Sequence, residues 1–164
     1  MSTVDSYQED IINIIADNIS HPIVLRDQTN PKMDYPFIAY KFITKLGNEP
    51  GQPILDSSIV TEEGEDWFKY THKKHYNMIL SLTSYSNSEI ESNNVIEELY
   101  DFMTFTGLTL FKNKNIIIKN IGDITERDTL IIDDYERRFG FDVEFRITKE
   151  LIKLIETIED VEYT

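Results

Sequence analysis

The chain has 164 residues, of which 40% are hydrophobic and 12% aromatic, so it is long enough to bury a core and has the composition of one globular domain. It contains no cysteine, which excludes disulfide bonds and thiolate metal sites. The formal net charge of −14 disfavours a nucleic-acid-binding protein, because such proteins gain affinity from Lys and Arg side chains that neutralise phosphates.

The N-terminal third predicts a helix followed by two strands. The helix is expected to begin near Ser6, because Ser6 and Glu9 have the spacing of a capping box. Apolar residues then recur at helical spacing at Tyr7, Ile11, Ile14, Ile15 and Ile19. Pro22 ends the helix, and the β-branched and aromatic residues of 23–26 and 37–43 predict the two strands.

Residues 47–66, GNEPGQPILDSSIVTEEGED, predict a long loop or a projecting hairpin around residues 54–60. Loops of this length in compact domains tend to be functional or disordered. We therefore expect a contact arm here. Its candidate contact residues are Ile54, Leu55, Ile59, Val60, Glu62 and Glu63.

A strand and the clearest helix of the chain follow the loop. Residues 67–85 alternate as a strand whose first half is expected to be exposed and whose second half is expected to pack against the core. Ser86 and Glu89 have the spacing of a second capping box, and Gly107 is the expected end of the helix. The apolar stripe between them consists of Val95, Ile96, Leu99, Tyr100, Phe102 and Met103.

The last third predicts two strands, at residues 115–125 and 135–147. In the second strand, Phe139, Phe141, Val143, Phe145 and Ile147 share one face. The tail from residue 148 fits a helix or a strand equally well. The whole pattern predicts one α+β domain over residues 1–164, with a mainly antiparallel sheet, two helices packed on one face, and a long projecting loop or hairpin.

Two arrangements of residues deserve consideration as catalytic or metal sites. His72 and His75 would lie together on a helix, but on a strand their odd spacing directs them to opposite faces. A nuclease-like site could combine an Asp at 133 or 134 with Glu144 and Arg146, although alternating charges on an exposed strand explain the same residues. No nucleophile motif and no phosphate-binding loop is present, so we expect no enzyme, no catalytic residue, no cofactor and no metal.

No apolar run approaches the roughly 20 residues that a membrane span requires. Acidic residues stand near the N-terminus, at Asp5, Glu9 and Asp10, where a secretory signal carries positive charge. We expect no membrane association, and a protein that is made in the cytoplasm and used there or assembled there into a larger structure.

The order of the elements resembles that of the neck-terminator or tail-terminator proteins of long-tailed bacteriophages. The likeness runs through YPFIAYKF, MILSLTSYS and VIEELYDFM to the closing segment IGDITERDTLIIDDYERRFGFDVEFRI, and covers nearly the whole chain. Its best part is Arg137 or Arg138 followed by residues 140–143, GFDV.

This resemblance implies a structural virion protein that forms a hexameric ring on the last ring of the tail tube. The ring would end tube polymerisation and join the tail to a neck or head-completion protein. Its partners would be further copies of itself, the tube protein and the neck protein, and DNA would pass through its channel without specific binding. The protein would then reside in the virion tail or neck after assembly in the host cytoplasm.

Within such a ring, Arg137 or Arg138 could pair with acidic residues of the next subunit. Pairing within the chain, with Asp133, Asp134 or Glu136, is the alternative for these arginines. The expected interface comprises Arg137, Arg138, Asp142, Glu144 and Arg146. The arm would touch the tube or an adjacent subunit.

Two other functions stay open at this point. One is an adaptor or stopper protein of the neck, because connector proteins of the phage neck share small α+β folds. The other, from a different class, is a metal-dependent nuclease.

Overall fold

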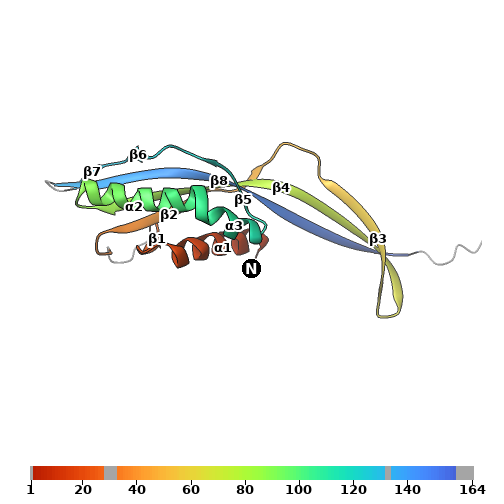
Figure 1. Ribbon diagram of the computed structural model, residues 1–164. Coiled ribbons are helices and arrows are strands. Elements are labelled where there is room, and N and C mark those ends of the chain that lie inside the picture. Colours follow the sequence, from red (N-terminus) through yellow and green to blue (C-terminus); the bar gives the residue numbers. More distant parts are fainter. Residues whose placement is uncertain (1, 28–32, 132–133, 158–164) are drawn as a thin grey trace, which may run out of the picture.

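The computed structural model describes residues 2–27, 33–131 and 134–157 of the chain. Figure 1 shows a body, in which helices cover the sheet, and an extension in which long strands continue without helices. The elements are α1 (Thr3–Asn18), β1 (Ile23–Leu25), β2 (Phe37–Asn48), β3 (Ile54–Glu62), β4 (Glu65–Ser86), α2 (Glu89–Asp101), the π-helix η1 (Phe102–Thr106), α3 (Gly107–Asn113), β5 (Ile117–Ile121), β6 (Thr125–Glu126), β7 (Thr129–Ile131) and β8 (Asp134–Glu156). Among the described residues, no helix has the length and apolarity needed to cross a membrane.

The sheet is built around two very long strands, β4 and β8. The strand order is β1-β2-β4-β8-β5, with β3 added to the free half of β4 and with β6 and β7 paired to β8. The β1–β2 pair is parallel and all the other pairs are antiparallel. The expected mixture of helices and a large sheet is therefore confirmed, while the sheet is mixed and not purely antiparallel.

The core lies between one face of the sheet and the helices. Successive side chains of a strand point to opposite faces, so alternate residues of β4 and β8 share the helix side. Those residues are completely or almost completely buried in the body: Met78, Leu80 and Leu82 of β4, and Phe141, Val143, Phe145 and Ile147 of β8. Isoleucines of α1 and the apolar stripe of α2 complete the same cluster. The predicted packing of the second half of β4 and the predicted apolar face of β8 are confirmed.

The first helix begins one turn earlier than the sequence pattern predicted. Ser2 is the N-cap: its hydroxyl accepts from the Asp5 backbone N–H at 3.1 Å and donates to the Asp5 carboxylate at 2.7 Å. The predicted capping box at Ser6 and Glu9 is wrong, because Ser2 and Asp5 offer the same pairing four residues earlier and the helix then runs through Ser6.

The second helix also differs from the prediction at both ends. Its N-cap is Ser88, and the predicted cap Ser86 instead donates its hydroxyl to Glu91. Gly107 does not end the helical stretch, since η1 and α3 follow α2 directly. At Gly107 a Cβ atom would lie 2.8 Å from the Phe102 carbonyl oxygen, so the glycine permits close packing inside the bend of the helix. The body therefore has a third helix that was not predicted.

Two segments that the sequence left open between alternatives, loop or hairpin at residues 47–66 and helix or strand after residue 148, contain strands. Residues 54–62 form β3, and a two-residue turn at Glu63 and Gly64, with φ of 53° and 86°, connects it to β4 as a hairpin. The ambiguous tail continues β8 as strand to Glu156. Residues 158–164 lie outside the described part of the chain.

Candidate assembly surface

The arm, as defined here, consists of β3, residues 65–75 of β4 and residues 148–156 of β8. These three strands pair in unbroken antiparallel register, with β4 in the middle. His72 of β4, for example, lies opposite Leu55 on one side and Leu151 on the other. Figure 1 shows the arm extending away from the helices.

Large apolar side chains are exposed on both faces of the arm. Leu55 is 73% exposed, Ile59 62% and Ile152 55%. The exposed apolar residues of the arm are Ile54, Leu55, Ile59, Phe68, Tyr70, Leu151, Ile152, Leu154 and Ile155. Clusters of large exposed apolar side chains are typical of surfaces at which proteins interact.

One face of the arm is hollowed over His72. The hollow has a volume of about 420 Å³, and it is lined by Leu55, Ser57, Tyr70, Leu151 and Lys153 together with neighbouring residues of the same strands. Leu55 and Leu151 come from the two outer strands. A side chain of a partner protein that enters the hollow would therefore contact both outer strands of the arm.

The residues predicted for the contact arm all lie at this surface. Ile54, Leu55, Ile59 and Glu62 are exposed on β3, Val60 is half-buried, and Glu63 is exposed in the turn. The prediction missed the contribution of β8, because Leu151 and Ile152 stand in the tail that the sequence pattern left unassigned.

At the start of β8, Arg137 is held by an aspartate of the same chain. Its Nη1 lies 2.6 Å from Asp128 Oδ2, and the Arg138 backbone N–H donates to Asp128 Oδ1 at 2.7 Å. Burial alone would raise the pKa of Asp128, but these two hydrogen bonds and the charge of Arg137 outweigh it and hold the pKa below its ordinary value. The same contact raises the pKa of Arg137, so both groups are charged in the folded chain.

Arg138 also has partners within its own chain. Its Nε donates to Glu136 Oε1 at 2.8 Å, and its guanidinium lies over the Tyr85 ring at 4.6 Å from the centroid. The Glu136 carboxylate is almost fully buried and also accepts from the Tyr35 hydroxyl. The pairing of Arg138 with Glu136 is one of the within-chain alternatives stated for the two arginines.

The remaining residues of the predicted interface lie on the opposite face of β8 from the core. Asp142 pairs with Arg127 at 3.2 Å, and Glu144 pairs with Lys119 at 3.2 Å. Arg146 lies between Asn77 of β4 and Ile117 of β5. These residues thus share one strand face, and the ion pairs of Asp142 and Glu144 connect β8 to other segments of the same chain.

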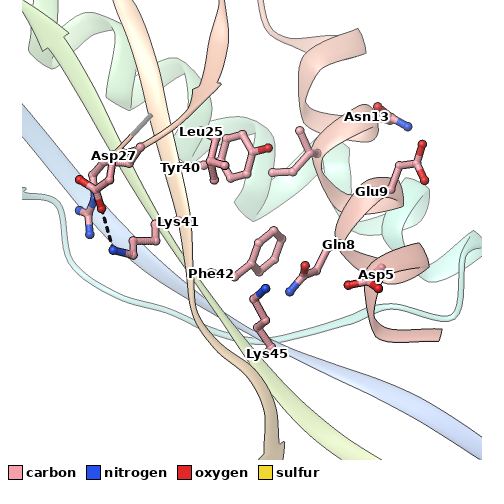
Figure 2. A pocket seen from close by; sticks show the side chains of 12 residues that line it. Asp5, Gln8, Glu9, Asn13, Leu25, Asp27, Tyr40, Lys41, Phe42 and Lys45 are labelled. Atoms are coloured by element: carbon pink, nitrogen blue, oxygen red, sulfur yellow. Dashed lines mark hydrogen bonds and ion pairs between the residues drawn. The ribbon is translucent and has the colours of Figure 1, made fainter. Parts of the chain in front are cut away.

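A groove separates α1 from β1 and β2. Figure 2 shows Gln8 of the helix pointing toward Phe42 and Lys45 of the strand, and Glu9 also lines the groove. The groove has a volume of about 610 Å³. The Gln8 Nε2 atom is buried and has no hydrogen-bond partner among the described residues. The groove is mixed in polarity, and its acidic and basic groups partly pair with each other, as Lys41 does with Asp27 at 2.6 Å.

The comparison with known families gives a match over nearly the whole chain. A model of the phage neck terminator protein family matches residues 9–164. The chain belongs to this family. No individually curated protein matches the chain. The resemblance inferred from the sequence is thereby confirmed, and the protein is a structural protein of the phage neck.

In this neck terminator family member, sequence reasoning missed the partners of the predicted residues. Arg127 donates to Ser81 and Thr83 at 3.0 and 3.1 Å, and a Cβ atom at Gly140 would lie 2.7 Å from its Nη1. The segment Glu126-Arg127-Asp128 supplies both this arginine and the partner of Arg137. The signal in the sequence was the run of three adjacent charged residues 126–128, but their long-range partners follow only from the pairing of β6 and β8.

The candidate metal and nuclease residues do not come together as one site in the neck terminator structure. Within residues 2–27, 33–131 and 134–157, no group of three or more His, Asp or Glu side chains could hold a metal ion. His72 and His75 both lie on β4, where their odd spacing places them on opposite faces, and His75 contacts Thr148 at 2.9 Å. Asp133 lies outside the described residues.

Proposed function

We propose that this protein forms a six-membered ring on the last ring of a phage tail tube, ends tube polymerisation and joins the tail to the neck or head. Family membership supports the location, and the resemblance supports the number of subunits. The observation that carries the proposal is the arm, whose apolar side chains are exposed on both faces. An exposed three-stranded arm is best explained by a partner that covers it, because burying each large side chain contributes about 1.5–3 kcal/mol.

The arm is proposed to contact the tube or an adjacent subunit through both of its outer strands. β3 contributes Ile54, Leu55 and Ile59, and β8 contributes Leu151 and Ile152. Burial of this exposed apolar area on assembly would provide the favourable free energy of the contact.

The interface proposed from the sequence is retained as a second contact. Arg137 and Arg138 keep 34% and 24% of their side chains exposed even though each has an acidic partner in its own chain. A guanidinium has five N–H donors, so each arginine can donate to a further carboxylate of a neighbouring subunit. Asp142, Glu144 and Arg146 extend this charged surface along β8.

The net charge of −14 supports a channel through which DNA passes without specific binding. An acidic surface repels the phosphates of DNA. Because few Lys and Arg side chains would contact phosphates, the DNA would be bound weakly and could move through the channel.

The experiment that tests the function measures the length of tail tubes that polymerise in the presence of the purified protein. The wild-type protein is expected to cap tubes as a ring visible by negative-stain electron microscopy and to stop their growth. A protein with Leu55→Glu and Leu151→Glu should leave tubes growing, because two buried carboxylates at the contact are strongly unfavourable.

The matched control is Ile90→Glu, which introduces the same charge at an apolar residue of α2 that is 74% exposed. It should still cap the tubes. If the wild-type protein leaves tube growth unchanged and binds neck or portal rings instead, the adaptor or stopper function replaces the terminator function.

A further inference from the structure

Both edges of the arm are open. β4 lies in the middle, and no described strand pairs with the outer edge of β3. On the other side, the last residue of β8 paired by β5 is Arg146, so no described strand pairs with the outer edge of residues 148–156, where the Thr148 carbonyl oxygen accepts from the Tyr7 hydroxyl. Such edges present rows of backbone N–H and C=O groups that can pair with another strand.

Neither edge carries a proline, a glycine or a bulge, which are among the features that prevent pairing. Residues 54–62 and 148–156 contain no proline and no glycine. Their register with β4 has no shift, whereas the β2–β4 pairing in the body has two. Long, regular and apolar edge strands are the ones that pair with another chain.

The two edges also match each other along the arm. Leu55 and Leu151 both lie opposite His72, and Ile59 and Ile155 both lie opposite Phe68. These four side chains therefore share one face of the arm at two matching heights. A neighbouring arm placed beside the first without axial shift would bring leucine next to leucine and isoleucine next to isoleucine.

Charge disfavours the pairing of two β3 edges. β3 carries Asp56 and Glu62 and no basic residue, whereas residues 148–156 are balanced, with Lys149 and Lys153 against Glu150 and Glu156. Two β3 edges would bring only acidic charges together, which is unfavourable for directly opposed residues.

We propose that successive copies of this protein pair through their arms, with residues 148–156 of one copy adding to β3 of the next. This inference rests on the proposed ring. β3 and β8 each run antiparallel to β4, so they run parallel to each other, and rotation about an axis along the arms preserves that direction. The pairing is therefore parallel. Because the two surfaces differ, it is a heterologous contact, which generates a closed ring when the rotation closes.

Cysteine cross-linking tests this pairing directly, because the native chain contains no cysteine. In the double variant Leu55→Cys/Leu151→Cys, the two cysteines of one chain are separated by β4, roughly 9–10 Å apart. A disulfide needs Cβ atoms about 3.5–4.5 Å apart, so one can form only between copies. Oxidation of the assembled protein should give a ladder of covalent multimers that ends at the size of the ring.

Two kinds of control variant test the register of the pairing and the face of the arm on which it occurs. Leu55→Cys combined with Lys149→Cys or Lys153→Cys reports a pairing shifted by two residues, because these lysines share the face of Leu151. Leu55→Cys combined with Ile152→Cys should give no ladder, since Ile152 points to the opposite face. Leu55→Cys alone should give no dimer.

The outcomes separate this inference from the proposed function. If rings form and cap tubes but no same-face variant cross-links, the edge pairing is overturned and the ring function stands. Dimers of Leu55→Cys alone would also overturn it, because they require two β3 edges to meet. If the protein forms no ring alone or on tubes and leaves tube growth unchanged, both proposals fail.

Discussion

The body and the arm are made from the same two strands, β4 and β8, which pair without interruption from Ser86–Arg137 to Trp67–Glu156. In the body, helices cover one face, and the side chains of Leu80, Leu82 and Phe145 are completely buried. In the arm, the only contact with a described helix that a hydrogen bond shows is that of Tyr7 of α1 with the Thr148 carbonyl oxygen, and residues such as Leu151 and Ile152 are more than half exposed. The backbone pairing is therefore the same in both regions. They differ in whether other elements of the chain cover the side chains.

The amino-acid pattern of β8 changes between the body, where helices cover the strand, and the arm. From Phe141 to Ile147 it alternates, with phenylalanine, valine and isoleucine on the core side and charged residues on the other. In the arm, adjacent residues are both apolar, as at Leu151-Ile152 and Leu154-Ile155. A strand that is apolar on both sides is typical of burial on both faces, which is what assembly of the arm would provide.

The sharpest contrast between the regions is expected from Leu80→Ala in the body and Leu151→Ala in the arm. Leu80→Ala removes fully buried methyl groups and should lower the free energy of unfolding by about 2–5 kcal/mol. Leu151→Ala should change it by no more than about 0.5 kcal/mol in the free chain, because the residue is half exposed. Urea unfolding of both variants measures this, and equal losses would contradict the division into body and arm.

A smaller loss is expected when a side chain is added at Gly140, which is buried under Arg127 on the face of β8 opposite the helices. In Gly140→Ala the new Cβ would lie 2.6 Å from the Leu82 carbonyl oxygen and 2.7 Å from Arg127 Nη1. Strand β8 or the arginine must move, so we expect a loss of about 1–3 kcal/mol. Thermal unfolding measures it, and an unchanged midpoint would show that Arg127 and β8 relax without cost.

The start of β8 should contribute a pH-dependent part of the stability. Because the pKa of Asp128 is lowered by folding, its contribution is fully present above the ordinary value of 3.8 and is lost as the pH falls through the folded value. Asp128→Asn should cost about 1–2 kcal/mol at neutral pH and flatten the loss of stability below pH 3.8. Denaturant titrations between neutral and acidic pH measure both effects. If the free energy of unfolding falls as steeply with pH in the Asp128→Asn variant as in the wild-type protein, Asp128 is not the source of this pH dependence.

The sequence predicted those parts of the molecule in which one physical signal dominates. Strands β2, β4 and β8 and helix α2 follow from strong periodicity, and the exposed residues Ile54, Leu55 and Ile59 were expected to form contacts. The N-cap of α1 was misplaced because Ser2–Asp5 and Ser6–Glu9 are equivalent by spacing, and only the packed structure decides between them.

The arm half of β8 could not be assigned from the sequence for a different reason. Apolar residues at positions 151, 152, 154, 155 and 158 fit both the helical period and a strand apolar on both faces. The pairing with β4, which is distant in sequence, decides in favour of strand as far as Glu156. The partners of Arg137 and Glu144 were missed likewise, because Asp128 and Lys119 approach them only once β5 and β6 pair with β8.

The most direct test of the account is amide hydrogen exchange of the arm before and after assembly on tail tubes. In the free protein, peptides from β3 and from residues 148–156 should exchange faster than those from the body half of β8, because each outer strand of the arm has an open edge. On assembly, both sets of arm peptides should become protected while the body changes little. Protection confined to the body, with β3 and residues 148–156 still exchanging as in the free chain, would contradict the claim that the arm is the assembly surface.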